Sequence, residues 1–220
     1  MGVNGKGTFV PFTRRHLFQG VKLHGVGMKG NVIESVFNTT DIHYMDGDRR
    51  DGSVIVFMRA GGSVHVTDPM VAAANQWGQR ENVVKYKRLH DDSDLPLEVT
   101  LRVDDITAIE VSMHDMTTVL VKAPFGVFPV VGKHESIVER TAYCRPFATF
   151  TKVTRNGNVP TAIPIDTILG VESSHVNNQT LVRTDIGRMP IVESVDAAME
   201  IIDREADAFN EALASLKNGS

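Results

Sequence analysis

Histidine, cysteine and acidic side chains are the groups in this chain of 220 residues that could carry acid–base, nucleophilic or metal chemistry. The eight histidines are scattered, and no two of them stand two or four positions apart, as they would if one strand or one helix turn held a metal ion. A single cysteine excludes a disulfide framework and any zinc site built on several thiolates. We therefore predict no metal site and no cofactor.

Cys144 could act as a nucleophile only if the fold supplied a base and an acid, for which His134 and Asp115 are the candidates. Its surroundings, Tyr143-Cys144-Arg145-Pro146-Phe147, indicate a boundary between two β-rich stretches, where a buried structural thiol is commoner. The chain has no Walker A loop, no Gly-x-Ser-x-Gly and no His-Glu-x-x-His. We predict no catalytic residue, and an enzyme whose site forms between modules or subunits stays an alternative.

Positive charge is concentrated near the N-terminus. Residues 1–30 include five Lys or Arg and no acid, whereas residues 193–220 include seven acids and two bases. Such polarity is typical of an arm that binds an anion, for example a phosphate backbone, an anionic ligand or a neighbouring chain's acidic tail. The sequence predicts an anion-binding patch made of Arg14, Arg15, Lys22, Lys29, Arg49 and Arg50.

Three stretches read as strand, glycine turn and strand, each followed by a potential helix. They are centred on Gly62, Gly126 and Gly187, which stand 64 and 61 residues apart. β-Branched runs supply the strands, and glycine supplies the positive φ that tight hairpins need. Upstream of the last two, residues 103–110 and 165–172 share the pattern apolar-Asp-x-Ile-x-x-apolar-Glu. If these stretches are copies, Val119/Leu181 and Val121/Arg183 should alternate between the same sheet faces.

The last of these stretches can be followed from residue 150 to residue 196. It runs through Thr154-Arg155-Asn156-Gly157, Ile165-Asp166-Thr167-Ile168, a Thr180 hairpin and Val192-Glu193-Ser194. Over residues 147–205, and partly over 97–142, the chain resembles the FlbD/SwrD family of small flagellar accessory proteins. It is also loosely similar to the LytTR DNA-binding domain. The FlbD/SwrD resemblance implies a small cytoplasmic accessory protein without catalytic residues.

These patterns predict a β-rich α+β fold of two or three tandem small β-sheet modules, each followed by a helix. The expected domains are 1–78, with the basic arm and a divergent first module, 79–145 with the second module, and 146–220 with the third. A composition 42% hydrophobic and 23% charged supports a real core. Because no apolar run reaches 18 residues and the N-terminus has no apolar signal region, we expect a cytoplasmic protein without membrane contact.

The C-terminal residues predict a long helix that begins after Ser194, a good N-cap, and continues to Lys217. Apolar residues recur every three or four positions, as in a coiled-coil seam, at Val195, Met199, Ile202, Ala206, Phe209, Leu213 and Leu216. We expect the seam through Ile202 to pack on its own sheet, and Phe209, Leu213 and Leu216 to meet another copy or another module's helix. The alternative is a helix packed along its whole length on its own chain.

The favoured function is a non-enzymatic binding or adaptor protein that acts as a homo-oligomer and carries an anion-seeking basic N-terminal region. The absence of a convergent set of acid, base and nucleophile in the sequence favours it. The alternatives are a protein that sequesters an anionic small molecule such as a nucleotide, a nucleic-acid-binding protein, and the enzyme described above.

Overall fold

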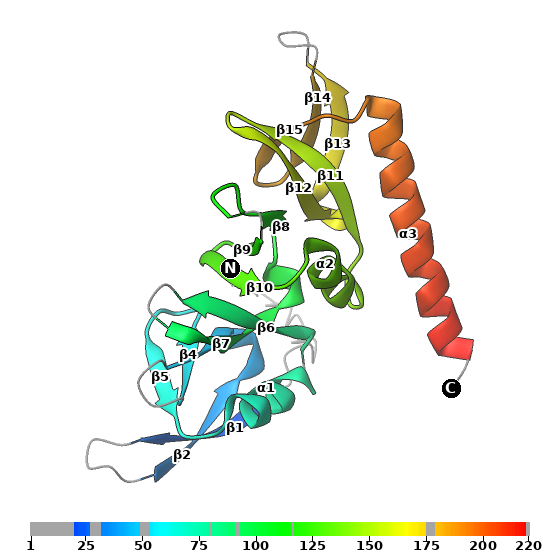
Figure 1. The fold of residues 1–220 in the computed structure, drawn as a ribbon. Coiled ribbons are helices and arrows are strands. Elements are labelled where there is room, and N and C mark those ends of the chain that lie inside the picture. The colour runs from blue at the N-terminus through cyan, green and yellow to red at the C-terminus, as the bar shows by residue number, and fades with distance from the viewer. Residues whose placement is uncertain are drawn as a thin grey trace, which may run out of the picture.

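Strands dominate the computed structural model, which describes residues 20–26, 32–48, 53–79, 81–90, 93–115, 117–174 and 179–218. The described part holds fifteen strands in one sheet and three α-helices (Figure 1). All pairs of neighbouring strands are antiparallel. The prediction of a β-rich α+β fold with a long C-terminal helix is confirmed.

The same order of elements occurs three times along the chain: two strands, a 3-10 turn, three strands and an α-helix. We call these stretches the first, second and third unit. The first consists of β1 Gly20–Val26, β2 Val32–Asn38, η1 Thr39–Asp41, β3 Ile42–Gly47, β4 Val54–Met58, β5 Ser63–Val66 and α1 Met70–Gly78. The second consists of β6 Val83–His90, β7 Ser93–Arg102, η2 Val103–Asp105, β8 Ala108–Val111, β9 Thr118–Ala123, β10 Gly126–Val131 and α2 His134–Ala142. The third consists of β11 Phe147–Thr154, β12 Gly157–Pro164, η3 Ile165–Thr167, β13 Ile168–Ser173, β14 Thr180–Thr184, β15 Gly187–Ile191 and α3 Val195–Asn218.

The strand order of the sheet is also the same in each unit. It runs β13-β14-β15-β11-β12, then β8-β9-β10-β6-β7, then β3-β4-β5-β1-β2. Within every unit the third strand of the chain order therefore lies at one edge and the second strand at the other. Neighbouring units are joined where such edges meet, at β12 with β8 and at β7 with β3.

Each unit has its own cluster of buried apolar side chains. Leu23, Ile42, Met45 and Trp77 belong to the first cluster, Tyr86, Leu101, Ile109 and Ile137 to the second, and Ala148, Phe150, Val182 and Ala198 to the third. The helices seal these clusters with one face. Met70, Ala73, Ala74 and Trp77 of α1 are buried at the three- and four-residue spacing that defines one side of a helix.

Hairpins are present at Gly62, Gly126 and Gly187 as predicted, although the expected alignment of the strands of the second and third units is wrong by one residue. Gly126 lies opposite Ala123 and Gly187 opposite Thr184, so the two glycines have equivalent places. Gly187 has the expected positive φ of 146°, whereas Gly126 does not belong to the positive-φ glycines. Counting from these turns, buried Val121 corresponds to buried Val182 and not to Arg183. A slip of one residue reverses the sheet face of every side chain.

Candidate binding surfaces

The residues predicted to bind an anion are mostly beyond what the structure describes. Arg14, Arg15, Lys29, Arg49 and Arg50 lie outside the described residues. Lys22 is on β1, and its Nζ is 2.6 Å from a carboxylate oxygen of Glu34 on β2, with both side chains more than half exposed. Its charge is thus matched by an acid on the neighbouring strand.

Cys144, His134 and Asp115 do not form a nucleophile, base and acid set. His134 begins α2, is buried, and its Nε2 lies 3.0 Å from the carbonyl oxygen of Ile109. Cys144 follows the other end of that nine-residue helix, about 15 Å along its axis. Burial, followed by the nearby Asp104 carboxylate, raises the pKa of the Cys144 thiol, which is the wrong direction for a nucleophile. Asp115 instead accepts hydrogen bonds from Thr117 and Thr118, which lower its pKa.

Within the described residues, no three His, Cys, Asp or Glu side chains gather where they could hold a metal ion. No helix among these described residues is long and apolar enough to cross a membrane.

The helix α3 extends far beyond the unit to which it belongs. It has 24 residues, whereas α1 and α2 have nine each. Its start is as predicted, since the Ser194 hydroxyl accepts a hydrogen bond from the backbone N–H of Ala197. Ala198, Ile201 and Ile202 contact the core of the third unit. Met199, which was expected to pack there, is 42% exposed, so the packed face is rotated from the predicted seam.

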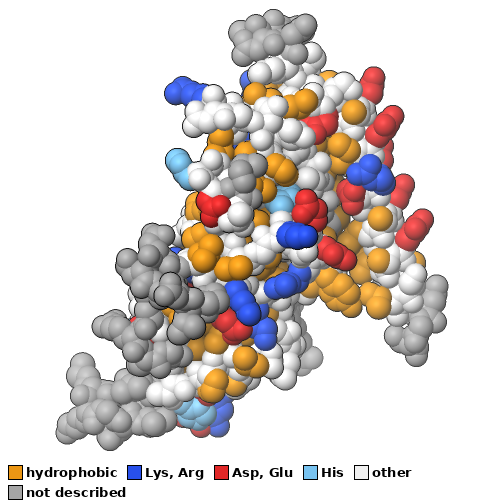
Figure 2. Space-filling view, viewed as in Figure 1, with side chains coloured by type: hydrophobic (Ala, Val, Ile, Leu, Met, Phe, Trp, Pro, Cys, Tyr) orange, Lys and Arg blue, Asp and Glu red, His pale blue; other side chains and the backbone are white. Residues whose placement is uncertain are grey.

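The C-terminal half of α3 runs beside α2 and presents apolar side chains. A groove of about 540 Å³ lies between the two helices. Val138 and Ala142 of α2 line it on one side, and Ala208, Phe209 and Ala212 of α3 on the other. Leu213 and Leu216 are 37% and 54% exposed. Figure 2 shows acidic side chains along the outward side of α3 and hydrophobic ones on the side facing α2.

A second hollow, of about 880 Å³, lies between β6 and α2 and carries basic side chains that are not part of the predicted anion-binding patch. Lys85 and Lys87 from β6 and Arg140 from α2 line it, together with Glu98, Glu139 and the aromatic ring of Tyr143, which is 73% exposed. Figure 2 shows Lys and Arg side chains gathered in this part of the visible face. Alternating lysines at positions 85 and 87 were a signal in the sequence, but Arg140 is 55 residues away from Lys85.

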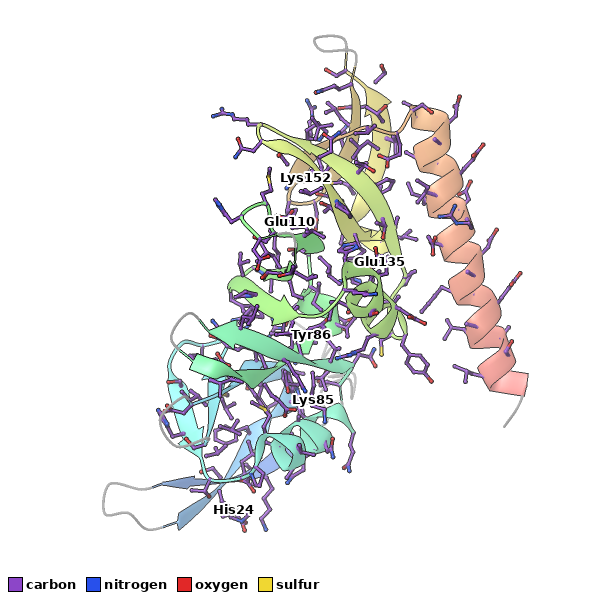
Figure 3. The ribbon with its side chains drawn as sticks, in the orientation of Figure 1. His24, Lys85, Tyr86, Glu110, Glu135 and Lys152 are labelled. Atoms are coloured by element: carbon purple, nitrogen blue, oxygen red, sulfur yellow. The ribbon has the colours of Figure 1, made fainter. Side chains whose placement is uncertain are left out.

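Tyr86, one of the residues that line this hollow, makes a buried polar contact. The Tyr86 hydroxyl lies 2.6 Å from the Thr141 hydroxyl, which is also 2.7 Å from the Ile137 carbonyl oxygen. Burial raises the pKa of Tyr86, so the phenol stays protonated. Lys85 lies beside this residue on β6, as Figure 3 shows, and its Nζ is 3.4 Å from the Asn75 side-chain oxygen.

The two joints between units each carry an equivalent ion pair. In one, Arg88 of β6 binds Asp46 of β3; in the other, Lys152 of β11 binds Glu110 of β8 with an N–O distance of 2.9 Å (Figure 3). Lys122 of β9 also binds Glu110. Burial disfavours the Glu110 anion, but hydrogen bonds from the two lysines outweigh it and lower the pKa of Glu110. In both joints a cation from a unit's first strand therefore meets an acid on the preceding unit's third strand.

Comparisons with known proteins give little further guidance. No protein-family model and no curated protein sequence matches the chain. Among solved structures, a LytTr DNA-binding domain from Bacillus cereus is similar over 55% of this chain and 93% of its own length, with 16% identity and a TM-score of 0.34. This distant likeness agrees with the loose similarity to the LytTR domain that the sequence indicated. The FlbD/SwrD resemblance stays a prediction. At this TM-score the likeness carries no argument about function.

Proposed function

We propose that this chain is a non-enzymatic binding or adaptor protein that acts as a homo-oligomer and is built from three tandem copies of one β-module. The shared order of elements and the shared strand order of the three units support the tandem arrangement. The proposed domain boundaries after residues 78 and 145 fall at or shortly after the ends of α1 and α2.

One observation carries the proposal of self-association: α3 continues for about four turns beyond the length that suffices in the other two units. A helix that only sealed its own module would not need Phe209, Leu213 or Leu216. Burying a fully exposed leucine side chain contributes about 1.5–3 kcal/mol, and part of this gain is unused at Leu213 and Leu216, which are 37% and 54% exposed. We infer that the same helix of a second copy covers them in a coiled-coil contact.

The substitutions Phe209→Glu and Leu213→Glu test this contact because they place two charges on its apolar face. We expect wild-type protein to have a mass above that of one chain by light scattering, and the double variant to have a lower mass. Met199→Glu is the matched control, since Met199 is an exposed apolar residue on the same helix near its beginning. A wild-type monomer, or a double variant with unchanged mass, would contradict the helix contact.

The hollow between β6 and α2 supports a second candidate function, the binding of an anionic small molecule that carries an aromatic ring. Lys85, Lys87 and Arg140 could bind phosphate groups, and the exposed ring of Tyr143 offers a stacking surface. A nucleotide combines both features. The predicted basic patch, of which Lys22 is the described member, would serve the same class of ligand or a nucleic acid.

Calorimetric titration with adenosine triphosphate and with inorganic phosphate tests this candidate. We expect the nucleotide to bind, and the double substitution Lys85→Ser and Lys87→Ser to weaken its affinity at least tenfold. Lys133→Ser, which removes an exposed cation elsewhere on the chain, is the control. Equal binding by the double variant, or no binding by the wild type, would exclude this hollow as the site; turnover of the nucleotide would overturn the non-enzymatic proposal.

A further inference from the structure

The fifteen-stranded sheet ends in two strands that each have one neighbour among the described residues. β13 pairs with β14 at one end of the sheet, and β2 pairs with β1 at the other. The two strands lie at opposite ends of the molecule (Figure 1). A strand edge of this kind presents backbone N–H and C=O groups to which another strand can bind.

These two edges are the same two kinds of edge that join the units inside the chain. β2 is the second strand of its unit, as are β7 and β12. β13 is the third strand of its unit, as are β3 and β8. Across the boundaries between units, the second strand of one unit pairs with the third strand of the preceding unit, β7 with β3 and β12 with β8.

The two internal joints also share one register. Thr100 lies opposite Met45 in the first joint, and Ala162 lies opposite Ile109 in the second. Thr100, Ala162 and Val36 each precede the 3-10 turn of their own unit by the same number of residues, so the three positions are equivalent. Counted in the same way, Met45 and Ile109 hold the position of Val171 in β13. The register is therefore a property of the edges and not of one particular pair of units.

We propose that copies of this chain join head to tail, with β13 of one copy pairing antiparallel with β2 of the next and continuing the sheet across the contact. Val36 then lies opposite Val171, and Ser35 opposite Glu172. This contact is separate from the helix contact proposed above and does not depend on it. Because it joins two different surfaces, it produces a ring if the rotation closes and a filament if it does not.

The exposure of the edge residues fits such a contact. Thr100 and Ala162 are fully buried in the internal joints, whereas Val36 at the same position is 51% exposed. The side chains of Asp46 and Glu110 are each 11% exposed, whereas Glu172, at the equivalent position, is 38% exposed. Both free edges thus expose groups that the internal joints cover.

One difference predicts that the joint between copies is weaker than the internal joints. In the internal joints, Arg88 and Lys152 supply the cations of the ion pairs. They lie opposite Val130 and Ile191 of their own units. The residue of β1 in this place, opposite Val66, is Gly25. Glu172 instead has Arg183 and Arg188 of its own unit at 3.8 and 3.5 Å. Without an ion pair across the contact, assembly should need a higher protein concentration than a joint with such a pair would need.

Complementation between two edge variants tests the head-to-tail joint. Val36→Lys places a charge opposite Val171 of the preceding copy, in a position that the joint must bury, so it blocks the β2 end. Glu172→Lys gathers three cations at the β13 end, next to Arg183 and Arg188, and blocks that end. Both variants also carry Phe209→Glu and Leu213→Glu, so that failure of the helix contact and failure of the edge contact are observed separately.

We expect the protein with only the helix substitutions to increase in mass with concentration in light scattering. Each edge variant alone should remain at one chain mass of 24.2 kDa, while their equimolar mixture should reach twice that mass and no more. Complementation also shows that both variants are folded. Val127→Lys is the control, because Val127 is 52% exposed on an internal strand, and it should assemble as its parent does. A parent that stays at one chain mass, a mixture that stays there, or an edge variant that still assembles alone would overturn the proposal.

Discussion

Replacing Glu110 by Gln should weaken the joint between the second and third units. The carboxylate is 11% exposed and binds Lys122 and Lys152, whose side chains are 31% and 27% exposed. Hydrogen bonds to charged groups contribute about 1.5–3 kcal/mol each. Partial exposure of the lysines reduces the gain from each pair, and the amide keeps one acceptor oxygen. We therefore expect a total loss of about 2 kcal/mol in the free energy of unfolding.

Urea denaturation followed by circular dichroism measures this loss as a lower midpoint, provided that the slope of the transition is unchanged. Glu172→Gln is the matched control, because Glu172 has the equivalent position at the free edge but is 38% exposed and its two arginines are 3.5 and 3.8 Å away. It should cost less than about 0.5 kcal/mol. Equal losses in the two variants would refute the argument that the internal joint depends on this buried carboxylate.

The same site predicts a pH dependence. Despite the opposing effect of burial, the lysine contacts leave Glu110 with a lower pKa in the folded chain than its unfolded value of about 4.3. The stabilisation is therefore complete above that value and is lost as the pH falls through the folded pKa. The difference in stability between wild type and Glu110→Gln should shrink below about pH 4. A difference that stays constant from pH 7 to pH 3 would contradict the assigned charge state.

Three further predictions concern other contacts. Thr141→Val leaves the buried Tyr86 hydroxyl without its partner and should cost about 1–3 kcal/mol in urea midpoints, whereas adding Tyr86→Phe should restore part of the loss. Arg145→Lys removes a guanidinium that binds both carboxylate oxygens of Asp166 and three carbonyl oxygens of residues 103–106. This substitution should lower the midpoint of thermal unfolding, because a lysine cannot make the same set of hydrogen bonds. An unchanged midpoint would show that the guanidinium contacts do not contribute to stability. Gly25→Lys supplies the cation that β1 lacks at the head-to-tail joint and should shift assembly to lower protein concentration, while a shift to higher concentration would contradict the register.

The sequence predicted the third unit well because each of its signals is local. Ser194 caps α3 as expected, and Gly187 forms its turn with positive φ. The alignment of β9 with β14 was wrong because Val119, Leu120 and Val121 are apolar at successive positions, so periodicity alone does not fix which side faces the core. Only the pairing with β8 and β13 decides it.

The joints and the basic hollow could not be predicted from the sequence because they depend on long-range pairing. Asp46 and Arg88 are 42 residues apart, as are Glu110 and Lys152. A search for similar residue types does not find this equivalence, since one joint uses Arg and Asp and the other Lys and Glu. What the units share is the position of opposite charges in the register. Likewise, Lys85 and Arg140 meet only because α2 packs beside β6.

Sedimentation velocity of the wild-type chain over a hundredfold range of concentration tests most directly whether this protein acts as a homo-oligomer. We predict that the measured mass exceeds that of one 24.2 kDa chain and rises toward a multiple of it as the concentration increases. A single species of 24.2 kDa at every concentration would contradict the central claim.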